Sequence, residues 1–206
     1  MRVAAGAPPR AGDFRRRRRE HGHEDIQRRQ RPVAARAEVG LVPVRQSAII
    51  KRWVAIGGAN SPVGGVLGYE ERVRGGTAQT FAKGDIFWSS TAGAWEVYGD
   101  ILTRYREIGG PDHALGLPIA APANAAEPGA TVQRFRVGRM FWSAATATRE
   151  VHGRIYTAYY NAGLDSGRLG LPNSYQTATP SGAQQTFEGG RIEWNSATNA
   201  TTVIYN

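Results

Sequence analysis

The sequence contains no cysteine among its 206 residues. Disulfide bonds, thiolate metal ligands and cysteine nucleophiles are therefore excluded. No apolar run approaches the roughly 18–20 residues that a helix needs to cross a bilayer, so we expect no membrane span. There is also no Gly-x-Ser-x-Gly elbow and no phosphate-binding loop, and His113 and His152 have no evident Ser or Asp partners. We therefore expect a protein that is not an enzyme and that uses no cofactor or metal.

Aromatic residues are nearly missing from the first 45 positions, where Phe14 is the only one of 19. This stretch holds 12 arginines against 5 acidic residues, whereas residues 46–206 hold 14 basic residues against 12 acidic ones. Because residues 1–45 have little to bury, we predict a disordered Arg-rich tail, in which no signal peptide is visible. Arginines neutralise nucleic-acid phosphates, but no aromatic is interleaved for base stacking. Nucleic-acid binding by this tail is therefore the least favoured function.

Residues 46–206 repeat one pattern three times, which a comparison of the sequence with itself reveals. The first marker is a Phe followed seven residues later by a Trp: Phe81 and Trp88, Phe135 and Trp142, and Phe187 and Trp194. The second is Leu-Gly-Leu-Pro at 115–118 and 169–172, which we match to Leu-Gly-Tyr-Glu at 67–70. The third is an Ile, an aromatic and a Gly at spacings of four: Ile49, Trp53 and Gly57; Ile101, Tyr105 and Gly109; Ile155, Tyr159 and Gly163.

The third marker predicts a helix at the start of each repeat. Ile101, Tyr105 and Ile108 recur at helical spacing, and Gly109 supplies the left-handed residue that ends a helix. The predicted fold is α+β: a tandem array of three helix plus β-hairpin units, arranged as an open arc or a propeller-like ring. The expected units span about 46–98, 99–152 and 153–206.

The first marker predicts the hairpin. We expect Phe81 to start a strand and a tight turn to follow it. By the two-residue period of a strand, Trp88 and Phe87 point to opposite faces. The Phe87 position is Phe141 in the second repeat and Glu193 in the third. A position that holds both Phe and Glu is not expected to be deep core in every unit.

These markers resemble the LGFP repeat of actinobacterial cell-envelope proteins. The resemblance covers about residues 46–206, and it departs from the motif at Tyr69-Glu70, where an apolar residue and Pro are usual. It rests on Leu-Gly-Leu-Pro at 115–118 and 169–172, on Phe-Glu-Gly-Gly-Arg-Ile-Glu-Trp at 187–194, and on Val-Tyr-Gly-Asp-Ile at 97–101 with Val-His-Gly-Arg-Ile at 151–155.

The resemblance implies a location in the cell wall or outside the cell. In that family the repeats are usually appended to secreted amidases or mycolyltransferases, which they hold against wall polysaccharide or peptidoglycan. We therefore expect a cell-wall or carbohydrate-binding scaffold, with a wall-modifying enzyme as a second partner. A fragment of a larger wall hydrolase or acyltransferase is an alternative.

Aromatic faces stack on sugar rings, so the candidate ligand-binding residues are Trp88, Trp95, Trp142, Trp194, Tyr98 and His152. Packing between repeats is the alternative for the three tryptophans that close the first marker. For Tyr98 and His152, whose slot we assign to Ile204 in the third repeat, the alternative is a side chain that satisfies backbone groups at a helix start. Trp95, with Arg149 in the matching place, is the better candidate for an exposed aromatic.

Overall fold

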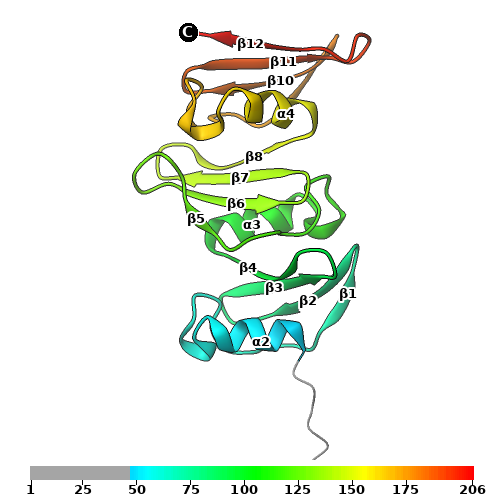
Figure 1. Ribbon diagram of the computed structural model, residues 1–206, viewed down its shortest axis with the longest axis vertical. Helices are drawn as coiled ribbons and strands as arrows, with labels where there is room; N and C mark the ends of the chain where they lie inside the picture. Colours follow the sequence, from blue (N-terminus) through cyan, green and yellow to red (C-terminus); the bar gives the residue numbers. More distant parts are fainter. Residues whose placement is uncertain (1–46) are drawn as a thin grey trace, which may run out of the picture. The chain divides into compact units, whose positions relative to one another are not determined.

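The computed structural model describes residues 47–206, which form three units of one helix and one four-stranded antiparallel sheet each (Figure 1). The predicted tail at 1–45 lies outside the described residues. The helices are α2 (Ala48–Ala55), α3 (Gly99–Glu107) and α4 (Gly153–Asn161), followed by the 3-10 turns η1 (Gly58–Asn60), η2 (Gly110–Asp112) and η3 (Leu164–Ser166). No helix in the described range is long and apolar enough to cross a membrane.

Each sheet is a meander of four strands in chain order. The first contains β1 (Glu71–Val73), β2 (Gly76–Thr80), β3 (Gly84–Ser89) and β4 (Gly93–Tyr98). The second contains β5 (Ala123–Asn124), β6 (Thr131–Phe135), β7 (Gly138–Ser143) and β8 (Ala147–His152), and the third contains β9 (Thr177–Thr179), β10 (Gly182–Phe187), β11 (Gly190–Asn195) and β12 (Thr201–Tyr205). The three helix plus hairpin units are confirmed, and each gains a short first strand.

The helix boundaries follow from local sequence. Before α3, Tyr98 is extended, and Ile101 and Tyr105 then place buried side chains one turn apart. Gly109 ends this segment with a φ of 102°, a left-handed conformation that glycine adopts without steric cost. Gly57 and Gly163 have φ angles of 110° and 93° at the matching points, so the same signal closes all three helices.

One helical tyrosine connects each pair of successive sheets. Tyr105 packs edge-on against Phe87 of β3, with ring centroids 5.5 Å apart, and against Phe135 at the end of β6 at 4.8 Å. Tyr159 does the same between Phe141 and Phe187, at 5.9 and 4.6 Å. One hydrophobic cluster thus joins the first and second units and another joins the second and third. Within residues 47–206 no cluster joins the first unit to the third, which favours an open array over a ring.

The Leu-Gly match in the first repeat was wrong by four residues. The residue that bridges to the end of the second strand is Val66 in the first unit, Pro118 in the second and Pro172 in the third. Trp53 Nε1 donates to the Gly64 carbonyl at 2.8 Å, as Tyr105 Oη donates to Gly116 and Tyr159 Oη to Gly170 at 2.8 and 2.7 Å. The loop equivalent is therefore residues 63–66, because its geometry is set by this hydrogen bond and bridge.

The expected role of Phe81 was also wrong. Strand β2 ends at Thr80, and Phe81 follows it as an isolated bridge partner of Val66. Phe135 and Phe187 occupy the last positions of β6 and β10. The Phe therefore lies at or just after the end of a strand, where its ring packs against the aromatic ring of the helix above it.

Candidate functional site

The three tryptophans of the first marker are half-buried and face the helix of their own unit. Each is two residues beyond a fully buried Ile86, Met140 or Ile192 and shares its face. Trp88 packs against the first-unit core, Trp142 against the cluster that holds Met140, and Trp194 against the cluster that holds Ile192. The three tryptophans therefore contribute to packing beneath the helix of their own unit, and each stays partly accessible.

Trp95 lies on the opposite face, near the edge of the first sheet. Its ring is half-buried, its Nε1 donates to the Ala92 carbonyl at 2.6 Å, and the Arg52 guanidinium carbon lies 4.7 Å from the ring centroid. In the second unit, Arg149 takes the Trp95 position and lies 4.4 Å from the ring of Tyr175. The position thus forms a cation–π contact in both units: it supplies the ring in the first unit, as Trp95, and the cation in the second, as Arg149.

Tyr98 and His152 stand at the junction of the last strand with the next helix. Neither side chain caps its helix, so the capping alternative is wrong. Strand pairing places Tyr98 opposite Gly84, His152 opposite Gly138 and Tyr205 opposite Gly190. The slot assigned to Ile204 therefore belongs to Tyr205, and all three units carry an aromatic or imidazole ring there.

His152 packs edge-on against His113, with ring centroids 5.0 Å apart. Burial lowers the pKa of the His152 imidazole, and the neighbouring His113 lowers this pKa further. Burial also lowers the pKa of His113, whose Nδ1 accepts a hydrogen bond from the Leu115 amide at 3.2 Å. Burial, followed by the charge of Glu96, raises the pKa of Tyr98. In the described part of the chain no three His, Asp or Glu side chains are grouped to hold a metal ion.

Each sheet has one face turned away from the helix of its own unit. On that face the three sheets differ in one row of paired residues, which runs across the second, third and fourth strands. The row is Ala78, Phe87 and Trp95 in the first sheet, Val132, Phe141 and Arg149 in the second, and Gln184, Glu193 and Thr202 in the third. Phe87 and Phe141 are buried under α3 and α4, whereas Glu193 is half-exposed. The expectation that this position is not core in every unit is confirmed.

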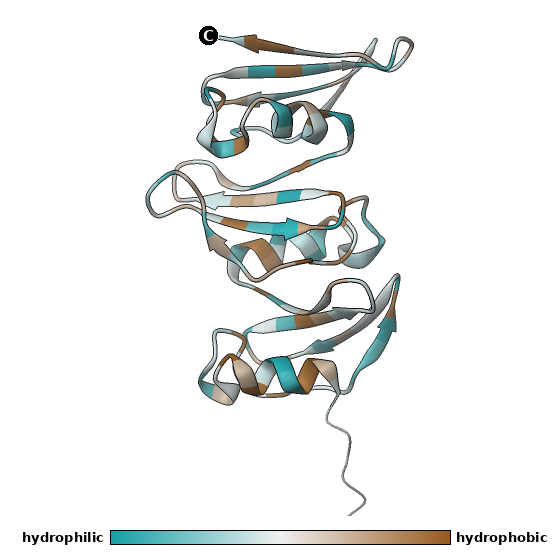
Figure 2. Cartoon of the chain, viewed as in Figure 1, coloured by the Kyte–Doolittle hydropathy of each residue, from teal (hydrophilic) through white to brown (hydrophobic). Residues whose placement is uncertain are grey.

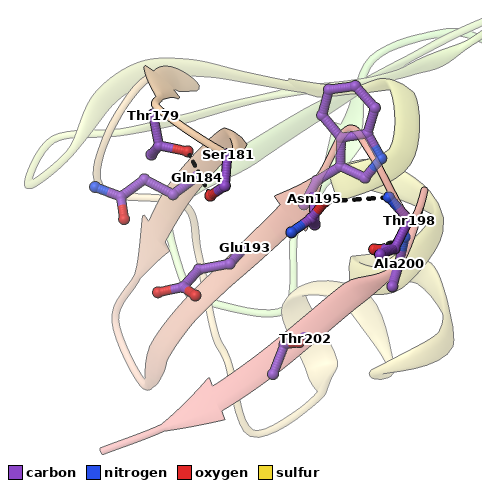
Figure 3. Close-up of a pocket in the computed structure, with 9 residues that line it drawn as sticks. Thr179, Ser181, Gln184, Glu193, Asn195, Thr198, Ala200 and Thr202 are labelled. Carbon is purple, nitrogen blue, oxygen red and sulfur yellow. Dashed lines mark hydrogen bonds between the residues drawn. The ribbon is translucent and has the colours of Figure 1, made fainter.

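This third row opens into a polar cleft of about 400 Å³. Figure 3 shows Gln184, Glu193 and Thr202 on three adjacent strands, with Thr179 and Ser181 beside them. The remaining lining residues are Trp194, Asn195, Thr198 and Ala200. Hydrophilic and hydrophobic colours alternate along β11 in Figure 2. Ile192 is buried between the more exposed Arg191 and Glu193, so the polar side chains lie on the face away from the core. A carboxylate, amides and hydroxyls on one surface can form many hydrogen bonds with a polyhydroxylated ligand.

The polar groups of the cleft are only partly engaged. Arg191 Nε donates to Glu193 Oε1 at 2.7 Å, and this pair is about half exposed, at 46% and 44%. Thr179 and Ser181 share a weak hydroxyl contact of 3.5 Å. Trp194 Nε1 donates to Asn199 Oδ1 at 3.2 Å. Of the sequence candidates only Trp194 lines this cleft, and the change from Phe to Glu at 193 was the one signal in the sequence that pointed to this position.

Comparison with known families agrees with the repeat pattern. A search of curated proteins found no match. The model of the LGFP repeat matches residues 64–112, 115–167 and 169–206, which is more than half of the sequence. The matched segments begin at the loop beneath each helix rather than at the helix itself, so the first two matches each span the loop, the sheet and the following helix. The chain belongs to the LGFP repeat family.

Proposed function

We propose that this chain is a non-catalytic wall-binding module and that the polar cleft of the third sheet binds wall polysaccharide or the glycan of peptidoglycan. The observation that carries the proposal is that Gln184, Glu193 and Thr202 replace a row centred on a buried Phe. In the first two sheets the tyrosine of the next helix covers that Phe. Where the row is polar, it is accessible and carries both donors and acceptors, which suits a ligand rich in hydroxyl groups.

The location that fits this function is the cell wall, outside the cytoplasm. The family resemblance supports this location, and a wall-modifying enzyme is the partner that it supports next. The cleft adds a physical reason, because a shallow polar surface of this size can hold a few sugar rings of a long polymer. Weak binding by such a surface is sufficient when a polymer offers many sites.

The test is co-sedimentation of the full chain with purified cell wall at about 0.15 M salt, where long-range charge effects are screened. A hydrogen bond to a charged group contributes about 1.5–3 kcal/mol, so Glu193→Gln should weaken binding by roughly tenfold or more. Gln184→Ala should weaken it less, because the amide is neutral.

The matched control is Glu107→Gln on α3. Glu107 is also an exposed glutamate in an ion pair, with Arg104 at 3.4 Å, and its loss removes the same charge. The proposal requires that this variant bind as the original chain does. A wild-type chain that stays in the supernatant, or equal losses in both glutamate variants, would show that the cleft is not the site.

A further inference from the structure

The first unit exposes four large apolar side chains, against two in the second unit and three in the third. Val54 is 54% exposed, Leu67 70% and Tyr69 92%. Ile50, on the first turn of α2, is half-buried. We call Ile50, Val54, Leu67 and Tyr69 the first-unit face. Exposed apolar side chains that exceed what a single domain needs on its surface can mark interaction sites.

Some counterparts of these residues in the later units contact the preceding unit, whereas Tyr160, at the Val54 position of the third unit, and Ile119, at the Leu67 position of the second, stay 59% and 40% exposed. Ile50 corresponds to Leu102, which is 5% exposed in the cluster that contains Phe87 of the first sheet. Val54 corresponds to Arg106, whose guanidinium binds the carboxylate of Asp85 in the first sheet at 2.7 Å. Two positions on α3 are therefore occupied by the sheet that precedes it.

Tyr69 has a counterpart in Tyr175. Gln79 Nε2 donates to the Gly68 carbonyl at 2.7 Å and Gln185 Nε2 to the Ser174 carbonyl at 2.9 Å, so the residues that follow are equivalent. The Tyr175 ring lies 4.0 Å from the Arg104 guanidinium and 4.4 Å from that of Arg149, both in the preceding unit.

We infer that the first-unit face is an open stacking surface for another LGFP-type repeat on a different chain. That repeat must present a sheet face with an aromatic and aliphatic row, as Phe87 and Val97 do, and an arginine at its edge to receive Tyr69. Phe87 and Val97 pack with α3 of the second unit, and Arg104 and Arg149 lie against Tyr175 of the third; the second unit has Ala121 at the Tyr69 position.

A second copy of this chain does not provide that partner. The outward face of its third sheet carries Gln184, Glu193 and Thr202, and stacking would bury these polar groups without partners. The free chain is therefore expected to be monomeric, and the inference does not depend on wall binding.

The experiment replaces the polar row of the third sheet, in the full chain, by the residues found in the second sheet. The triple variant Gln184→Val, Glu193→Phe and Thr202→Arg copies Val132, Phe141 and Arg149 of the second sheet. A head-to-tail contact of this type does not close and forms open chains. Light scattering should show a weight-average mass that rises roughly twofold or more with concentration, while the wild type remains monomeric.

The blocking control combines that triple variant with Val54→Ser, Leu67→Ser and Tyr69→Ser, which alter exposed side chains only. It should restore the monomer. A folded triple variant that stays monomeric, or one that associates equally with the face blocked, overturns the inference. A dimer of the wild-type chain would also overturn the inference, because a second copy would then occupy the face. Association that appears only after residues 1–45 are deleted would overturn it too, because those residues would then be the occupant. If the triple variant fails to fold, as judged by circular dichroism, the single variant Glu193→Phe is compared with and without the blocked face in the same way.

Discussion

The second and third units fill the same space between helix and last strand in opposite ways. In the second, Arg104 of α3 forms a two-pronged ion pair with the buried Glu150 of β8, at 2.7 and 3.0 Å. The first unit repeats it with Arg52 and Glu96, at 2.7 and 2.8 Å. In the third, the matching residues are the apolar Ala158 and Val203, which join the hydrophobic cluster there.

The difference shows that this space requires matched partners rather than charge. Taking two ions out of water cancels much of their mutual attraction, so an ion pair and an apolar pair of good fit are close in net stability. An unmatched combination has no such balance, because a buried charge is left without its counterion. The Glu150 side chain, 8% exposed, and Arg104, 21% exposed, are far enough from water for this to matter.

The largest expected effect comes from breaking the match in the second unit. Glu150→Ala leaves Arg104 largely buried, with only the exposed Glu107 carboxylate at 3.4 Å beside it, and we expect a loss of about 3 kcal/mol in the free energy of unfolding. The double variant Arg104→Ala and Glu150→Val installs the residues of the third unit and should recover most of that loss. Urea denaturation of the full chain measures both. A double variant as unstable as the single one would contradict the comparison.

A smaller difference in stability is expected when the hydrogen bond from the helical tyrosine to the loop beneath it is removed in the second or the third unit. Burial raises the pKa of Tyr105 and Tyr159, so both phenols are protonated donors at neutral pH. Gly116, which accepts from Tyr105, is buried, whereas Gly170, which accepts from Tyr159, is half-buried. Tyr105→Phe should therefore cost about 1–2 kcal/mol and Tyr159→Phe less, because water can reach the carbonyl of Gly170. Denaturation midpoints that fall in the reverse order would contradict this account.

The same comparison shows which features the sequence could reveal. The helices, the Phe-to-Trp hairpins and the number of units follow from local spacing, which is visible in one dimension. The first loop was misplaced because residues 63–66 share only Gly64 with the Leu-Gly-Leu-Pro pattern, and a hydrogen bond from Trp53 identifies them. The last strand was shifted because the third unit has one more residue between its paired positions, Trp194 and Thr201, than Trp88 and Ala94 have.

The candidate cleft was hidden for a related reason. Its row combines Gln184, Glu193 and Thr202, which are far apart in the sequence and meet only through the register of three strands. Glu193 alone stood out, since it replaces a Phe. A single substitution indicated that the position is not core, but it did not indicate which polar groups lie beside it.

The smallest expected effect concerns the histidine pair, which only the second unit has. The first unit carries Ser61 and Tyr98 in the places of His113 and His152. Because burial lowers both histidine pKa values, the unfolded chain binds protons more readily than the folded one. Their contribution to stability is therefore complete above the unfolded pKa of about 6.5 and is lost as the pH falls below it. Between pH 7 and pH 5, the melting temperature of the double variant His113→Ser and His152→Tyr should fall by about 1–3 °C less than that of the wild type. Acidic residues titrate in both proteins, so the difference between the two melting curves isolates the imidazoles, and identical curves would mean that the pair does not respond to protons.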